Sequence, residues 1–147
     1  MSGLEILLGG CICGEVCYTA RGNLGGGYAC HCLDCQTRSG SAFATMLPVA
    51  WDTLTFAGTL CEWQQVSSSG EASQTFACAQ CFTRLFTRRS IWPGMAVLRA
   101  GTLERSREFV ARVHLWTRSA QGWIVIPPHV PAFETQPASR DAWKSLQ

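Results

Sequence analysis

The sequence predicts an all-β fold, and three observations lead to this prediction. Gly, Pro, Ser and Asn interrupt the chain about every eight to twelve residues, and the short segments between them are rich in β-branched and aromatic residues. No long segment has the periodicity of an amphipathic helix. Seven of the nine cysteines fall into three short clusters, a pattern typical of metal sites that hold a small fold together.

Each expected strand lies between two such interruptions. In chain order the expected strands are Ile12–Thr19, Ala42–Pro48, Thr53–Phe56, Leu60–Val66, Gln74–Ala77, Arg84–Thr87, Met95–Ala100, Ala111–Leu115 and Trp123–Ile126. The run Ser67-Ser68-Ser69-Gly70 predicts a hairpin connection. The glycines of Gly22–Gly27 predict a flexible loop whose backbone could approach a ligand closely.

Helix is expected in only two short places. One or two turns follow Cys35, and a C-terminal helix covers Ser139–Leu146 with Ser139 as its N-cap. A group of prolines predicts an extended, irregular stretch before the second helix. These prolines are Pro127, Pro128, Pro131 and Pro137.

Length and composition predict a single domain over residues 1–147. The chain is 47% hydrophobic and 15% charged, enough for one core, and its net charge of +2 favours neither nucleic acid nor an anionic membrane as a partner. Eleven of the twelve basic residues are arginine, which suits bidentate recognition of carboxylates. Met1–Gly10 contains Glu5 and lacks the features of a secretory signal, and no run could span a bilayer. We therefore expect a cytoplasmic protein.

The cysteine spacing favours metal over disulfides, because the count is odd, no export signal is present and the cysteines form tight CxC and CxxC pairs. The clustered residues are Cys11, Cys13, Cys30, Cys32, Cys35, Cys78 and Cys81. The other two, Cys17 and Cys61, stand alone and are expected to act as small hydrophobic residues.

Two metal ions account for the clusters best. The segment Cys30–Cys35 supplies three ligands by itself, and the pairs Cys11/Cys13 and Cys78/Cys81 can complete each other as a four-cysteine site. Zinc with four protein ligands is structural, whereas zinc with three keeps a position for water or substrate. The alternative is that both sites are closed by a further ligand. The candidates for that ligand are Cys17, Cys61, His31 and His114.

Several motifs in order along the chain resemble the glutathione-dependent formaldehyde-activating enzyme (GFA) family. The first part comprises Gly10-Cys11-Ile12-Cys13-Gly14, Cys30-His31-Cys32-Leu33-Asp34-Cys35, Ser39-Gly40-Ser41-Ala42-Phe43 and Phe76–Cys81. The second part comprises Pro93-Gly94-Met95, Arg99-Ala100-Gly101-Thr102-Leu103, His114, Trp123 and Pro131-Ala132-Phe133. The resemblance therefore covers most of the chain.

The resemblance implies a zinc-stapled fold of two or three small antiparallel sheets with few short helices. It implies two zinc ions, a structural one on Cys11, Cys13, Cys78 and Cys81 and a catalytic one on Cys30, Cys32 and Cys35. The implied activity is that of a carbon-sulfur lyase, S-(hydroxymethyl)glutathione synthase-like, which joins glutathione and formaldehyde.

For such a reaction we expect a thiol held as thiolate at the open metal and a proton donor for the new hydroxyl group. The candidate donors are His31, Asp34 and His114. The expected contacts to substrate come from Gln36, Arg38 and Ser41, all close to Cys35 in sequence. Two other functions remain open: cleavage of the carbon-sulfur bond of another thiol conjugate, and a noncatalytic zinc-binding interaction module.

One position departs from the family pattern. Phe82 stands where the family usually has glycine after the last cysteine of the CxxC pair. Because phenylalanine accepts the left-handed conformation poorly, we expect a local adjustment of this turn.

Overall fold

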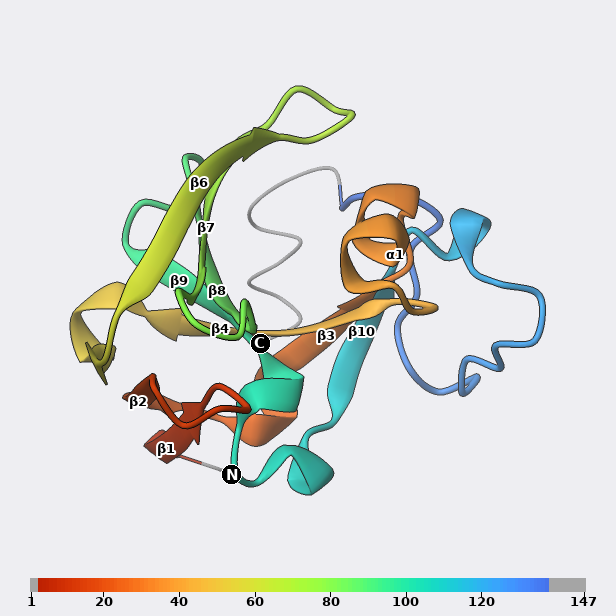
Figure 1. Ribbon diagram of the computed structural model, residues 1–147. Coiled ribbons are helices and arrows are strands. Elements are labelled where there is room, and N and C mark those ends of the chain that lie inside the picture. The colour runs from red at the N-terminus through yellow and green to blue at the C-terminus, as the bar shows by residue number, and fades with distance from the viewer. Residues whose placement is uncertain (1–2, 138–147) are drawn as a thin grey trace.

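The computed structural model describes residues 3–137, which form two β-sheets and one α-helix (Figure 1). The smaller sheet has the order β1-β2-β5, with β1 at Glu5–Gly10, β2 at Cys17–Gly22 and β5 at Thr55–Ala57. Both pairs in this sheet are antiparallel. The prediction of an all-β fold is confirmed.

The larger sheet has seven strands in the order β10-β3-β4-β9-β8-β7-β6. Its strands are β3 (Gly27–Cys30), β4 (Ala44–Ala50), β6 (Leu60–Val66), β7 (Ala72–Cys78), β8 (Arg84–Arg89), β9 (Met95–Arg99) and β10 (Ala111–Leu115). Neighbours are antiparallel except β10 and β3, which run parallel. The sheet is thus larger than expected and not purely antiparallel.

Helix α1 spans Leu33–Ser39 and carries the end of the central cysteine cluster. Cys32 is its N-cap, and the Cys32 sulfur accepts a hydrogen bond from the backbone N–H of Cys35. Gly40 ends the helix with φ of 64°, a conformation that glycine adopts without steric cost. The predicted helix is therefore present, but it begins before Cys35 rather than after it.

The remaining helical segments are single 3₁₀ turns. They are η1 (Leu24–Gly26), η2 (Trp51–Thr53), η3 (Ala100–Thr102), η4 (Ser106–Glu108) and η5 (Thr117–Ser119). Across residues 3–137, no helix combines the length and apolar character needed to cross a membrane.

The seven-stranded sheet buries a core on each face. Consecutive side chains of a strand point to opposite faces, so Leu98 joins the core between the two sheets while Val97 joins the core on the other side. The first core also contains Tyr18 and Phe86, and the second contains Tyr28. The second face is the one that carries the cysteines of β3 and α1.

Several predicted elements agree closely with the structure. Strands β6 and β10 occupy the predicted ranges residue for residue, and five other predicted strands correspond to β4, β5, β7, β8 and β9 with shifted ends. The hairpin connection is confirmed, since the Ser67 N–H donates to the Glu71 carbonyl at 2.9 Å and Gly70 has φ of 86°.

Other predictions are wrong. Residues 11–16 form a turn, so the strand predicted at Ile12–Thr19 begins only at Cys17, and β1 and β3 were not predicted. Trp123–Ile126 forms no strand and pairs with no neighbour; the Val125 side chain is 88% exposed. Apolar and β-branched residues alone do not make a strand without a partner.

The glycine-rich stretch Gly22–Gly27 is not a flexible ligand loop. It holds the turn η1, capped by the Asn23 side chain, and Gly27 opens β3. A Cβ atom at Gly27 would lie 2.1 Å from the Phe109 ring and 2.6 Å from the Met46 carbonyl oxygen. Glycine is needed there for close packing. The C-terminal helix predicted at Ser139–Leu146 lies outside the described residues.

Candidate metal centres

The first candidate centre joins two turns that are far apart in sequence. Cys11 and Cys13 lie in the turn between β1 and β2, whereas Cys78 ends β7 and Cys81 lies in the turn that leads to β8. All four sulfurs lie within 4.8 Å of one another. The centre therefore connects the smaller sheet to the larger one.

The sulfur spacing fits a tetrahedral metal site. The Cys11 and Cys13 sulfurs are 3.5 Å apart, and those of Cys13 and Cys78 are 3.7 Å apart. Zinc–sulfur bonds of 2.3 Å give a tetrahedral edge of about 3.8 Å. Backbone N–H groups of Val16 and Gln80 donate to the Cys11 and Cys78 sulfurs, which stabilises negative charge on them.

Phe82 adopts the left-handed conformation in the turn of this centre, with φ of 61°. Its N–H donates to the Cys78 carbonyl at 3.0 Å, and the Cys78 N–H donates to Thr83. The Phe82 side chain is 69% exposed. The turn thus keeps the geometry that glycine would favour, and phenylalanine occupies it at a steric cost.

The second candidate centre is local in sequence. Cys30 ends β3, Cys32 caps α1 and Cys35 lies in the first turn of that helix, so a strand, a cap and a helix bring three sulfurs within 4.8 Å of one another. Within residues 3–137, no fourth Cys, His, Asp or Glu ligand atom completes this group. Cys17, Cys61, His31 and His114 belong to neither group.

Three thiols this close together compete for protons. Hydrogen bonds from Cys30 and Cys35 lower the pKa of the Cys32 thiol to about 2, whereas hydrogen bonds with Cys32 and Cys35, followed by burial, raise the pKa of Cys30 above its usual range. Without a cation, mutual repulsion prevents all three from ionising together. A bound divalent ion would remove that conflict. A purely thiolate donor set suits zinc.

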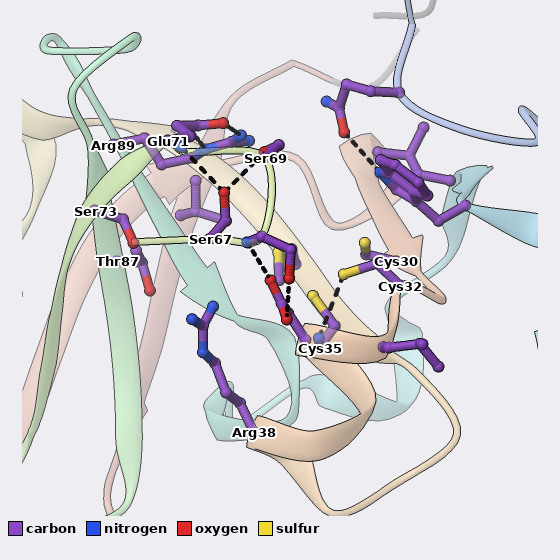
Figure 2. A pocket seen from close by; sticks show the side chains of 18 of the residues that line it. Cys30, Cys32, Cys35, Arg38, Ser67, Ser69, Glu71, Ser73, Thr87 and Arg89 are labelled. Carbon is purple, nitrogen blue, oxygen red and sulfur yellow. Dashed lines mark hydrogen bonds and ion pairs between the residues drawn. The ribbon is translucent and has the colours of Figure 1, made fainter. Parts of the chain in front are cut away.

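A cavity of about 400 Å³ lies directly over the second centre (Figure 2). Cys30, Cys32 and Cys35 form one side of it, and none of the cysteines of the first centre line it. Opposite them, the strands of the larger sheet contribute Thr87 and Arg89. The two centres therefore differ in their surroundings: the first connects the two sheets, and the second borders a space large enough for a small molecule.

The tip of the β6–β7 hairpin covers part of this cavity and is tied to α1. Both carboxylate oxygens of Asp34 accept hydrogen bonds from Ser68, one from its N–H at 2.9 Å and one from its hydroxyl at 2.8 Å. Ser67, Ser69 and Glu71 of the tip also line the cavity (Figure 2). The tip is thus held against the helix that carries Cys35.

Of the three candidate proton donors, the structure brings only Asp34 to the cavity wall. His31 has no exposed surface, and its Nε2 pairs with His114 Nδ1 at 2.9 Å. Burial lowers the pKa of both imidazoles, and the charge of His114 lowers that of His31 further. This neutral pair sits where β3 and β10 adjoin and is absent from the cavity lining.

The three residues expected to contact substrate are also separated. Arg38 lines the cavity, and its side chain extends from α1 into the space in front of the sheet (Figure 2). The Gln36 amide donates instead to the carbonyls of His31 and Ser119, both at 2.8 Å. Ser41 is exposed and does not line the cavity.

Most of the remaining polar lining was not identified from sequence. The sequence predicts only a hairpin at Ser67–Ser69 and no individual role for Arg99 or Tyr28, yet all of them line the cavity. Tyr28 and Arg99 reach the same wall through strand register, because Tyr28 pairs with Met46 and Met46 pairs with Arg99. Single-sequence patterns do not contain that register.

Two cysteine groups that could hold metal ions, one of four sulfurs and one of three sulfurs beside a cavity, are typical of cysteine-ligated metal proteins. A profile of the family described as glutathione-dependent formaldehyde-activating enzyme matches residues 6–119. The chain belongs to this family, which confirms the resemblance in its motifs.

Comparison with solved structures shows the same fold. The chain is similar to a crystal structure of a Rhodobacter sphaeroides protein, with a TM-score of 0.54 and 19% sequence identity. The match covers 66% of this chain and 87% of that one. The search of curated proteins found no match.

Proposed function

We propose that the protein is a zinc-dependent carbon-sulfur lyase that joins a thiol such as glutathione to formaldehyde or a related aldehyde, or cleaves that adduct. The observation that carries this proposal is the three-sulfur group of Cys30, Cys32 and Cys35, which has no fourth ligand within residues 3–137 and borders a cavity of about 400 Å³. A noncatalytic zinc module would gain nothing from this arrangement.

Cys30, Cys32 and Cys35 would hold the ion. Bound zinc would lower the pKa of an incoming thiol and keep it as thiolate at neutral pH. Cys11, Cys13, Cys78 and Cys81 would hold the second zinc, whose role is to connect the sheets.

The reaction itself is an addition without redox change. The thiol sulfur forms a bond to the aldehyde carbon, the carbon-oxygen double bond becomes a single bond, and the thiol proton ends on the new hydroxyl group. The cavity walls would align the two reactants and limit access of bulk water, which is how a site of this kind raises the rate.

Among the three candidate donors, Asp34 is best situated to pass that proton, because it lines the cavity and the two histidines do not. His31 and His114 would support the site by fixing β3 against β10, since they pair with each other at 2.9 Å. Gln36 would do the same for α1 through its bonds to His31 and Ser119. Arg38 would contact the substrate, and for Ser41 the structure offers no contact that supports such a role.

The test is exchange between free and thiol-bound formaldehyde, followed by NMR exchange spectroscopy with glutathione. Because the addition also proceeds without protein, the measured quantity is the exchange rate above that background. We expect zinc-loaded protein to accelerate exchange and Cys35→Ser to abolish the acceleration, with Cys61→Ser as a matched control that retains it. Equal rates with and without protein would contradict the proposal.

A further inference from the structure

One edge of the seven-stranded sheet has no partner among residues 3–137. Strand β6 is the last strand of the sheet and pairs only with β7 (Figure 1). The Ala79 N–H donates to the Thr59 carbonyl at one end of this pair, and the Ser67 N–H donates to the Glu71 carbonyl at the other. Because bonded and free backbone groups alternate along an antiparallel edge strand, the odd-numbered residues of β6 bond to β7. The even-numbered residues direct their N–H and C=O groups away from the sheet. They are Leu60, Glu62, Gln64 and Val66.

The other sheet edges are covered or short. At β10, the His114 N–H donates to the Pro131 carbonyl at 3.0 Å, and the Phe133 N–H donates to the His114 carbonyl at 2.9 Å. At β1, the Glu104 N–H donates to the Leu8 carbonyl at 2.9 Å. Strand β5 has only three residues. Within the described residues, β6 is therefore the longest edge left open to another strand.

Strand β6 also lacks the features that keep edge strands from pairing. Natural edge strands are commonly short, carry Lys or Pro, or contain a bulge. Strand β6 has seven residues, none of them Lys, Arg or Pro, and it pairs with β7 in an unbroken register. Its one charged residue is Glu62. The edge is thus a regular template for a further strand.

The sequence of β6 is complementary to itself in antiparallel orientation. When Trp63 of one copy lies opposite Trp63 of another, the outward-directed residues pair as Leu60 with Val66 and Glu62 with Gln64. Val66 is 64% exposed, so this register covers one apolar side chain with another. It also keeps the two Glu62 carboxylates from lying directly opposite each other, as they would in a pair centred on Glu62. A twofold interface requires such self-complementarity.

We propose that the β6 edge binds a second copy of this chain, and that the two β6 strands pair antiparallel about Trp63 into one continuous sheet. Main-chain hydrogen bonds of the even-numbered residues supply most of the affinity. An edge of seven residues is a small interface, so we expect a weak dimer with a Kd of about 1–100 μM. Because β6 leads into the hairpin tip beside the cavity, dimer formation would also restrain that tip.

The experiment measures oligomeric state and backbone protection on the full chain. Sedimentation equilibrium from about 1 to 300 μM should show a monomer–dimer equilibrium. Over the same range, amide hydrogen exchange at Glu62 and Gln64 should slow at least about tenfold, because their N–H groups become bonded only in the dimer. The N–H groups of Trp63 and Gln65 bond to β7 and should stay protected at every concentration.

Substitutions at Gln64 test the pairing and its register. Gln64→Pro removes an outward N–H without removing a bond to β7, so it should raise the dimer Kd at least about tenfold. The matched control Gln64→Ala keeps that N–H and should change the Kd less than about twofold. Gln64→Glu places like charges opposite Glu62 and should raise the Kd at least about threefold, whereas Gln64→Lys should bind at least as tightly as wild type.

A wild-type protein that remains monomeric at about 300 μM would overturn the proposal. A dimer that Gln64→Pro leaves intact would form through another surface and would overturn it as well, as would exchange at Gln64 that does not change with concentration. Should Gln64→Pro fail to fold, the comparison of Gln64→Glu with Gln64→Lys decides, because equal Kd values for these two variants contradict the register.

Discussion

Replacing Cys78 by serine should destabilise the protein far more than replacing Cys32. Cys78 has no exposed surface, and its sulfur lies 3.7 Å from that of Cys13, 65 residues earlier in the chain. A zinc ion at this centre closes a long loop between two sheets, whereas Cys32 belongs to a group formed within six residues. The first centre therefore contributes to global stability and the second mainly to the cavity.

The magnitude follows from the binding energy of structural zinc. Such sites contribute about 10–16 kcal/mol of apparent binding free energy, comparable with the about 5–15 kcal/mol net stability of a domain. Losing one of four ligands should therefore cost at least about 3 kcal/mol. For a chain of this size that lowers Tm by about 10 °C or more.

The assay combines thermal unfolding with zinc content per chain. We expect Cys78→Ser to lose one zinc and most of its soluble yield, and Cys32→Ser to remain folded while losing activity. Cys61→Ser is the matched control, since Cys61 lies beside this centre, makes only a weak contact to the Cys78 carbonyl at 3.8 Å, and belongs to neither group. Equal Tm losses in Cys78→Ser and Cys32→Ser would refute this division of roles.

Three further predictions concern single positions and the hairpin tip. Phe82→Gly should raise the free energy of unfolding by about 1 kcal/mol, because φ of 61° strains the backbone of any residue with a Cβ atom. Phe82→Ala should gain less, and equal Tm values for the two variants would count against backbone strain. Gly58→Ala should lower the free energy of unfolding by at least about 2 kcal/mol, since φ is 101° and the new Cβ would lie 2.0 Å from the Glu15 carbonyl oxygen. An unchanged Tm would show that the turn relaxes freely. Asp34→Asn should speed amide hydrogen exchange at Ser68 about tenfold, because the variant loses the charged acceptor of the Ser68 N–H. Unchanged exchange would mean that other contacts hold the tip of the β6–β7 hairpin.

Local patterns predicted the features that depend on neighbouring residues. The hairpin at Ser67–Gly70 and the three ligands from Cys30 to Cys35 lie within a few residues of one another, so composition and spacing indicate them directly. Strand β6 was also predicted residue for residue. The sequence also predicted which cysteines lie together, because seven clustered cysteines can be divided between two metal sites in only a few ways.

Features that depend on pairing between distant segments were not predictable in this way. Strand β3 is a strand because β4 and β10 flank it, although its first residue, Gly27, is a poor strand former. Trp123–Ile126 has suitable residues but no partner. The cavity wall likewise depends on register, which brings Arg99 to the same face as Tyr28 through an intervening strand.

In the proposed function, one of two cysteine-bound zinc ions is open to an incoming thiol. The most direct measurement is the absorption spectrum of the cobalt-substituted protein during titration with glutathione, because the charge-transfer intensity reports the number of thiolate ligands. The expected result is a saturable increase for wild-type protein that Cys35→Ser abolishes and Cys61→Ser retains. A spectrum that glutathione leaves unchanged would contradict the claim.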